Sequence, residues 1–158
     1  MKQRSWKKIV LWLVVAGVAA FALIQLVPYG HDHSNPPVVK EPAWDSPQTR
    51  ALVKESCFDC HSNETEWTFA SYIAPSSWLI RKDVDKGRKK LNFSEWAGQV
   101  GWGQIEAVVN NGRMPPTRYS MVHPGAKLTD AEKQQLIDGM KATLSAPAAP
   151  STSPTPAP

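Results

Sequence analysis

One apolar run near the start of the chain limits what the rest of it can fold into. Residues 9–27 contain no charged side chain, and Gln25 is the only strongly polar residue among them. About 19 such residues are enough for one helix to cross the hydrocarbon core of a bilayer. Because the run is apolar on every face, it does not suit the one-sided burial of a helix in a soluble domain. We predict a transmembrane signal anchor at 9–27.

The charges around this run predict how it is oriented. The basic flank at 1–8 carries the whole net charge of +4, since the other 14 basic residues balance 14 acidic ones. Such a flank stays in the cytoplasm, so the chain after residue 27 is delivered to the opposite side. A cleavable signal peptide ending near Ala20-Phe21-Ala22 is the alternative, but the apolar run continues beyond that site. The balanced charge of the remainder gives no sign of nucleic-acid binding.

The only two cysteines of the chain stand in the segment Cys57-Phe58-Asp59-Cys60-His61. This is the Cys-x-x-Cys-His pattern of covalent c-type haem attachment. Two thiols at this spacing reach two vinyl groups on one edge of a porphyrin, and the adjacent imidazole points at the iron. His61 is therefore the candidate proximal ligand. The pattern favours haem c as the cofactor.

Three other uses of this segment remain as alternatives. A structural disulfide would close a very short loop and stabilise little. A thioredoxin-like redox pair normally follows a buried strand, and no β-branched run precedes Cys57. A structural zinc site needs about four ligands, and the sequence offers no second ligand pair near the first.

Composition divides the chain after the anchor into three parts. A proline-rich lead at 28–44 is predicted to be extended and solvated. A tail at 146–158 contains only Ala, Pro, Ser and Thr, and is predicted to be disordered. Residues 45–145 remain for one compact haem-binding domain.

Capping and stop signals predict helices and no strand within this domain, so the expected fold class is all-α. Ser46 is an N-cap followed by proline, and Thr129 with Glu132 forms a capping box. Glycine or Asn-Gly is expected to end the second and third helices. The expected helices run from Ser46 into Cys57, from Ser76 or Ser77 to Gly87, from Gln104 to Asn110, and from Thr129 to Leu144.

A haem iron that passes electrons usually needs a second axial ligand. We expect Met114, because it stands in a proline-stiffened stretch between two predicted helices. His123 is the alternative distal ligand, and His31 and His33 rank behind it because they lie on the lead. Met121 and Met140 are expected to be buried hydrophobic side chains.

Two further expectations concern the surroundings of the haem. The carbonyl of Ala74 could accept the free ring N–H of His61 and fix its orientation. The basic residues between 81 and 90 could form a solvated helix face, or a contact for haem propionates or an acidic redox partner. Trp44, Trp67, Trp78, Trp96 and Trp102 supply either a haem pocket or a general aromatic core.

The layout resembles class I cytochromes c, with a helix ending in Cys-x-x-Cys-His, a Met-Pro segment and a C-terminal helix. Over about residues 28–145 it is similar to the small membrane-anchored haem-binding domain family of bacteria. The matching blocks are Cys57 to Thr65, Ile73 to Leu79, Leu91 to Trp96, Met114-Pro115-Pro116 and His123 to Thr129. The resemblance implies a c-type haem facing the periplasm, held by Cys57, Cys60 and His61.

Together these features predict a cytochrome c-like helical domain with one haem, anchored to the bacterial inner membrane by a single pass. We expect it to pass single electrons between redox partner proteins at the periplasmic face, with no catalysis of its own. The alternatives are a haem-based sensor or peroxidase-like enzyme with an open sixth iron position, and a thiol redox protein that uses only the cysteine pair.

Overall fold

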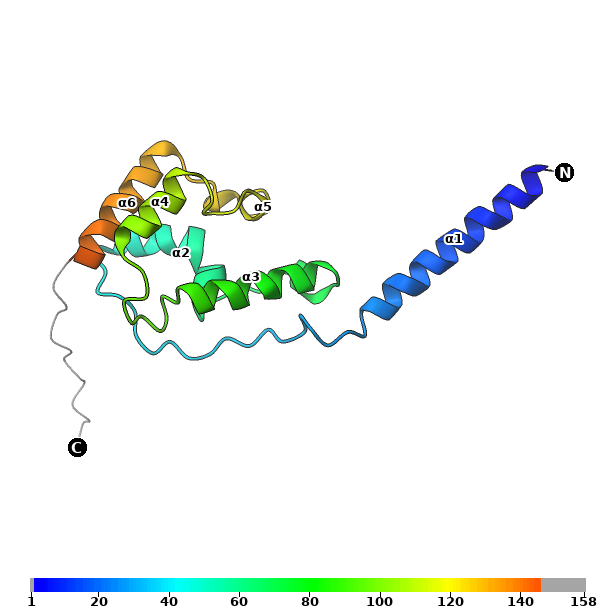
Figure 1. Cartoon of the computed structure of the whole chain (residues 1–158), viewed down its shortest axis with the longest axis horizontal. Coiled ribbons are helices and arrows are strands. Elements are labelled where there is room, and N and C mark those ends of the chain that lie inside the picture. Colours follow the sequence, from blue (N-terminus) through cyan, green and yellow to red (C-terminus); the bar gives the residue numbers. More distant parts are fainter. Residues whose placement is uncertain (1, 146–158) are drawn as a thin grey trace, which may run out of the picture. The chain divides into compact units, whose positions relative to one another are not determined.

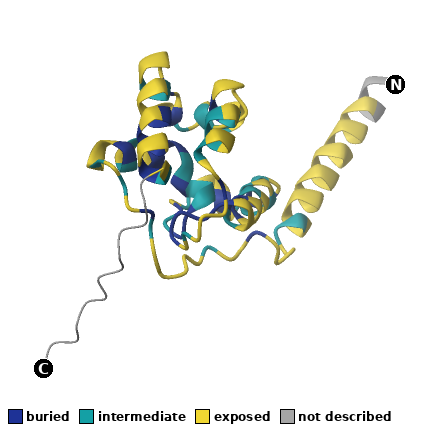
Figure 2. Cartoon of the chain, turned by 60° about the vertical axis from the view of Figure 1, so that its left-hand side comes forward, coloured by how far each residue is buried: buried dark blue, intermediate teal, exposed yellow. Residues whose placement is uncertain are grey.

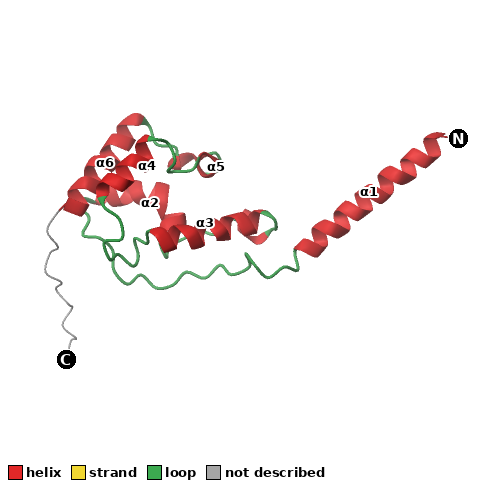
Figure 3. Cartoon of the chain, viewed as in Figure 1, coloured by secondary structure: helices red, strands yellow, loops and turns green. Residues whose placement is uncertain are grey.

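The computed structural model describes residues 2–145, and the predicted tail at 146–158 lies outside them. The described chain is all-helical, which confirms the predicted fold class (Figure 1). Its only β-type pairing is an isolated bridge between Lys40 and Glu95, and Figure 3 accordingly shows helices and loops. The elements are α1 (Lys2–Ile24), α2 (Pro47–His61), η1 (Phe69–Tyr72), α3 (Ser76–Lys90), α4 (Trp102–Asn110), α5 (Thr117–Ser120), η2 (Pro124–Ala126) and α6 (Asp130–Ser145).

Helix α1 includes residues 9–24 of the predicted anchor at 9–27 and is long and apolar enough to cross a membrane over Trp6–Ile24. None of that stretch is buried within the protein. Regular helix ends at Ile24, and the N–H groups of residues 25–27 then bond to carbonyls three residues earlier. The helix therefore ends slightly before the apolar run does.

Contacts between residues group the described chain into two compact units. Unit 1 comprises the residues up to Ser34 together with Glu66–Asp85. Unit 2 comprises Asn35–Thr65 together with the residues from Lys86 onward. Helix α3 runs from unit 1 into unit 2. The predicted boundaries of the lead and of a single domain at 45–145 stay predictions.

Unit 2 is built around an aromatic and aliphatic core (Figure 2). The rings of Phe58 and Phe93 stack with their centroids 5.7 Å apart, and Trp96 stacks on Phe93 at 6.1 Å. Trp44 contacts both phenylalanine rings. Two of the five tryptophans outside α1 thus belong to this packed core. The buried members of the core are Val53, Phe58, Leu91, Phe93, Val100, Val109, Leu128, Leu136, Ile137 and Met140.

Two of the predicted helix starts are confirmed in detail. The Ser46 hydroxyl accepts a hydrogen bond from the N–H of Thr49 at 3.2 Å, with Pro47 as the first helical residue. At α6, the Thr129 N–H donates to the Glu132 carboxylate at 2.7 Å, and the Glu132 N–H donates to the Thr129 hydroxyl at 3.2 Å. This is the reciprocal pattern of a capping box.

The predicted stop at Gly87 is wrong, because α3 continues through it to Lys90. The third helix also starts earlier than predicted, at Trp102 after Gly101 as N-cap. Gly87 is buried and has a packing role, described below. A glycine that permits close packing and a glycine that ends a helix look the same in a sequence.

The proline-rich lead contains no helix after residue 28, and it is not simply solvated as predicted. Within unit 2 the N–H groups of Val39 and Lys40 both donate to the carbonyl of Ser94, at 2.9 and 3.0 Å. The Lys40 carbonyl accepts from the N–H of Trp96 at 2.8 Å. Residues 35–40 therefore pack as an edge of unit 2.

Candidate haem-binding site

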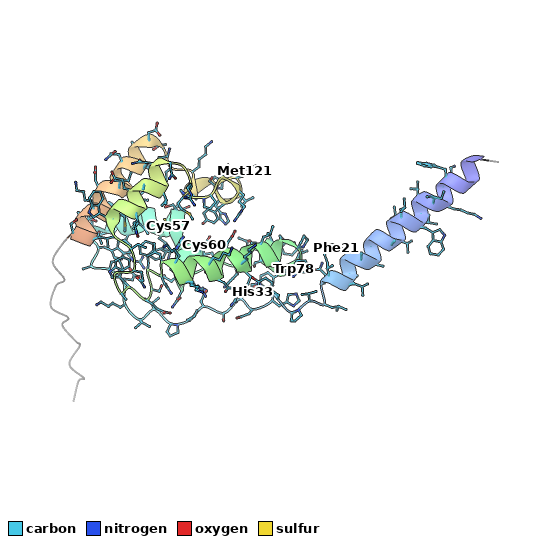
Figure 4. The ribbon with its side chains drawn as sticks, in the orientation of Figure 1. Phe21, His33, Cys57, Cys60, Trp78 and Met121 are labelled. Atoms are coloured by element: carbon cyan, nitrogen blue, oxygen red, sulfur yellow. The ribbon has the colours of Figure 1, made fainter. Side chains whose placement is uncertain are left out.

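The end of α2 presents the two thiols and the imidazole of the Cys-x-x-Cys-His segment. Residues three apart on a helix share a face, so Cys57 and Cys60 lie one turn apart on the same side of α2. Neither forms a disulfide, both are half-buried, and Figure 4 shows them on this helix. His61 is the last residue of α2 and is also half-buried.

The His61 ring is oriented by α3. Its Nδ1 lies 3.1 Å from the carbonyl oxygens of both Gly87 and Leu91. A carbonyl only accepts, so Nδ1 carries the proton and Nε2 keeps its lone pair for a metal. Burial lowers the pKa of His61 despite the two carbonyls, which favours this neutral form.

The prediction that the His61 ring donates a hydrogen bond to the Ala74 carbonyl is wrong. That carbonyl accepts instead from Gln25 Nε2 at 3.2 Å, within unit 1. The carbonyls of Gly87, in the last turn of α3, and of Leu91, directly after that helix, take the role expected of Ala74.

Gly87 lets α3 approach the cysteine segment closely. A Cβ atom at this position would lie only 2.1 Å from the Cys60 carbonyl oxygen. Any side chain here would have to push α3 away from α2. The same close approach brings the Gly87 carbonyl to His61, so the absence of a side chain positions the proximal imidazole.

Just after His61, Asn63 is the centre of a polar network. Asn63 receives a hydrogen bond from Asn92 and donates to the Pro37 carbonyl and the Glu95 carboxylate, all at 2.8–2.9 Å. Its own N–H donates to the Ser94 hydroxyl at 2.9 Å. Sequence reasoning did not identify this network as part of the site, although both strings, Ser62-Asn63 and Asn92-Phe93-Ser94, stand in the blocks that carry the family resemblance.

The candidate distal ligands lie together on the segment between α4 and α6. We call residues 111–126 the methionine segment. The N–H groups of Arg113 and Met114 both donate to the Val108 carbonyl at 3.0 Å, which fixes the Met114 backbone to the end of α4. The Met114 side chain is 37% exposed. Met140 is buried as predicted, but the same prediction for Met121 is wrong, because it is 77% exposed.

The methionine segment contacts the cysteine segment through a polar cluster. The Tyr119 hydroxyl donates to Asp59, between the two cysteines, at 2.7 Å. The His123 ring stacks on Tyr119 at 4.1 Å, and its Nε2 lies 3.8 Å from the same carboxylate. Burial and the neighbouring Asp59 carboxylate raise the pKa of the Tyr119 hydroxyl, so it stays a hydrogen-bond donor.

The other residues expected near a haem have different surroundings. His33 lies in unit 1, where Nε2 is 2.7 Å from the Ser71 carbonyl and the ring packs on Tyr72. His31 is also in unit 1 and is exposed. Two arginines of the basic stretch are engaged within the fold, since Arg81 binds Asp32 and Arg88 donates to the Ser62 carbonyl. The exposed lysines of the stretch are Lys82, Lys86, Lys89 and Lys90.

The donor set fits haem better than a bare metal ion. Within the described residues, no group of three or more His, Cys, Asp or Glu side chains is arranged to hold a metal. A structural zinc site therefore lacks its ligands. Haem brings four nitrogen ligands of its own, so one imidazole beside two cysteines that form no disulfide is a sufficient protein contribution on one face.

The chain matches a protein family and a curated relative. The relative is the protein named Cytochrome c peroxidase Ccp of Escherichia coli, 27% identical over 95 residues. The match covers 54% of this chain and 20% of that protein, so the chain spans about a fifth of its length. No solved structure matches. The model of the haem-binding domain family matches residues 19–142, and the chain therefore belongs to this haem-binding domain family.

Proposed function

We propose that this chain is a membrane-anchored, periplasmic c-type cytochrome with one haem that passes single electrons. The observation that carries the proposal is the end of α2, where two cysteines that form no disulfide stand one turn apart beside an imidazole whose Nδ1 is already hydrogen-bonded. When bound, haem supplies the one-electron chemistry of its iron. The protein attaches it, orients the axial imidazole and limits access of water.

Cys57 and Cys60 are the proposed attachment residues. Each thiol would add across one vinyl group of a bound haem: the S–H bond and the vinyl π bond break, one C–S and one C–H bond form, and no net oxidation or reduction occurs. His61 Nε2 is the proposed proximal ligand, with the Nδ1 proton held by the carbonyls of Gly87 and Leu91. Because the sequence has only two cysteines, it can attach one haem in this way.

Met114 is the proposed distal ligand and His123 the alternative. Both lie in unit 2 with the cysteine segment, whereas His31 and His33 belong to unit 1. The Nε2 atom of His123 already faces the Asp59 carboxylate, and its ring stacks on Tyr119. The Met114 thioether is partly exposed, and thioether sulfur is a common haem ligand in cytochromes c.

The alternative of a thiol redox protein is disfavoured by the position of the cysteines. Reactive thiols of that class sit at helix N-termini, where their pKa is lowered. Here both cysteines are in the last turns of α2. Burial raises the pKa of the Cys57 thiol to about 11, although the Ser56 hydroxyl opposes this. Such a thiol is protonated at neutral pH, in contrast to the lowered-pKa thiol that this class of protein requires.

The proposed location is the inner membrane, with residues after α1 in the periplasm. It rests on the apolar stretch Trp6–Ile24 and on the basic flank before it. Redox partner proteins with acidic surfaces are the proposed partners. The exposed lysines in the last turns of α3, Lys86, Lys89 and Lys90, would meet such a surface and speed association.

A second candidate function is a peroxidase-like haem site, because the curated relative is named a cytochrome c peroxidase. Such a site needs a sixth iron position that is open or easily vacated. Electron transfer needs that position closed. The two functions therefore differ in the behaviour of the methionine segment.

The deciding experiment is the visible spectrum of the reduced full-length protein, matured with c-type haem, before and after carbon monoxide. An unchanged spectrum supports electron transfer, and a rapid shift favours the peroxidase-like site or a sensor. Met114→Ala is expected to open the iron to carbon monoxide. His123→Ala is expected not to, and Met121→Ala is the matched control from the same segment. If His123→Ala opens the iron and Met114→Ala does not, the ligand assignment is reversed.

A further inference from the structure

The end of α1 is fastened to another part of unit 1 through Gln25. Its side chain donates to the Ala74 carbonyl at 3.2 Å and accepts from the Ala74 N–H at 2.9 Å. The only strongly polar residue of the apolar run therefore binds both backbone groups of one residue, and Ala74 itself is fully buried. Residues around Ala74 are thus held at the level where α1 ends.

Further contacts fasten the chain just after α1 to the same part of unit 1. Gly30 has φ +87° and packs so closely that a Cβ atom would lie 2.9 Å from the Ser77 backbone. Arg81 binds Asp32 through both its carboxylate, at 2.9 Å, and its carbonyl, at 2.7 Å. These contacts hold residues 66–85 to the exit of α1, and we call this stretch the collar.

The collar exposes large apolar side chains on either side of Ala74. Phe69 is 80% exposed, Tyr72 is 56% exposed and Leu79 is 58% exposed. Leu26 and Tyr29, directly after α1, are exposed as well. Single exposed apolar residues are ordinary on soluble proteins. Here several exposed apolar side chains are held at the end of a helix that is long enough to cross a bilayer. This is the arrangement of a membrane-interface belt, in which aromatic side chains lie at headgroup level.

We propose that the collar rests on the phospholipid bilayer, with Phe69 and Leu79 in the interface between headgroups and acyl chains. This rests on the proposed membrane anchoring by α1 and adds a second contact with the same membrane. The bilayer is the expected partner of this surface, because the collar is hydrogen-bonded to Gln25, which directly follows the apolar helical stretch Trp6–Ile24. The collar then fixes how unit 1 stands on the membrane, instead of leaving α1 as a tether only.

The test is photo-crosslinking of the full-length, haem-loaded protein in vesicles of phosphatidylethanolamine and phosphatidylglycerol. The photoreactive residue p-benzoylphenylalanine replaces Phe69 in one variant and Leu79 in another. It replaces Val18 within α1 as a positive control, and the 71% exposed Val122 of unit 2 as a matched exposed control. Phospholipid adducts are measured by mass spectrometry of the protein, and circular dichroism checks that each variant is folded.

The expected result is lipid adducts at positions 18, 69 and 79, with at least several-fold fewer at 122. Adducts at 18 without adducts at 69 and 79 would overturn the collar proposal while leaving the anchor intact. Absence of adducts at 18 would contradict the anchor itself, and the collar proposal with it. Equal adduct yields at 69, 79 and 122 would show nonspecific reaction with lipid and would also overturn the proposal.

Discussion

The two parts of unit 2 that carry the candidate iron ligands are built in opposite ways. On the side of His61, the chain from Phe58 to Asn63 is enclosed by α3 and by residues 92–95, and its polar groups are paired in a buried network. On the other side, the methionine segment has only two short helical turns, and Met121 and Val122 are largely exposed. The proximal side is therefore positioned by the packed fold, whereas the distal side depends on a few local contacts.

This difference teaches where sequence changes act. A change on the proximal side strains the fold and the imidazole together, since the same atoms support both. A change in the methionine segment alters the proposed distal ligand or its surroundings while leaving the core in place. The following expectations order such changes from the largest effect on stability to the smallest.

Gly87→Ala has the largest expected effect. The added Cβ atom would lie 2.1 Å from the Cys60 carbonyl oxygen, so α3 must move away from α2. We expect a loss of about 3 kcal/mol in unfolding free energy and reduced covalent haem incorporation. Gly103→Ala in α4 is the control, because its Cβ atom meets nothing within 4 Å, and it should stabilise by about 0.5 kcal/mol. Thermal unfolding of the full-length protein in detergent measures both, and equal effects would refute the packing role of Gly87.

Asn63→Ala is the next test, because Asn63 is 3% exposed and forms four hydrogen bonds. Removing its side-chain amide breaks three of these bonds and leaves the buried Asn92 amide without this acceptor, which costs about 2 kcal/mol. The same substitution at Asn111, an exposed residue of the methionine segment, should change stability by less than about 0.5 kcal/mol. Unfolding midpoints of the two variants, compared with the unmodified protein, decide the point. Similar losses would mean that the two sides are equally constrained.

Much of the fold followed from the sequence, and the exceptions share a physical cause. The starts of α2 and α6 were predictable because Ser46 and the Thr129 capping box act through neighbouring backbone groups. Gly87 was misinterpreted because its role depends on Cys60, which is 27 positions away. The partner of the His61 ring was missed for the same reason. Local chemistry is visible in a sequence, whereas the approach of two helices is not.

Tyr119→Phe tests how the methionine segment is held. The variant loses the 2.7 Å hydrogen bond to Asp59 but keeps a ring that can stack on His123. We expect a loss of about 1 kcal/mol, together with faster hydrogen exchange confined to residues 117–126. Tyr29→Phe is a suitable control, because that residue is exposed and lies in unit 1. Unchanged exchange in the segment would mean that the bond to Asp59 does not restrain it.

The smallest expected effect is a pH dependence that belongs to the proximal side. Hydrogen bonds from Arg50 lower the pKa of Glu41 below its ordinary 4.5, and Arg50 also lies over the Phe58 ring. Because the folded pKa is the lower one, this stabilisation is present above pH 4.5 and is lost as the pH falls through the folded value. Both side chains are partly exposed, so we expect about 1 kcal/mol at most. Glu41→Gln should remove this part of the acid sensitivity of thermal unfolding. If the variant and the unmodified protein lose stability in parallel below pH 4.5, the Glu41–Arg50 pair does not support the proximal side.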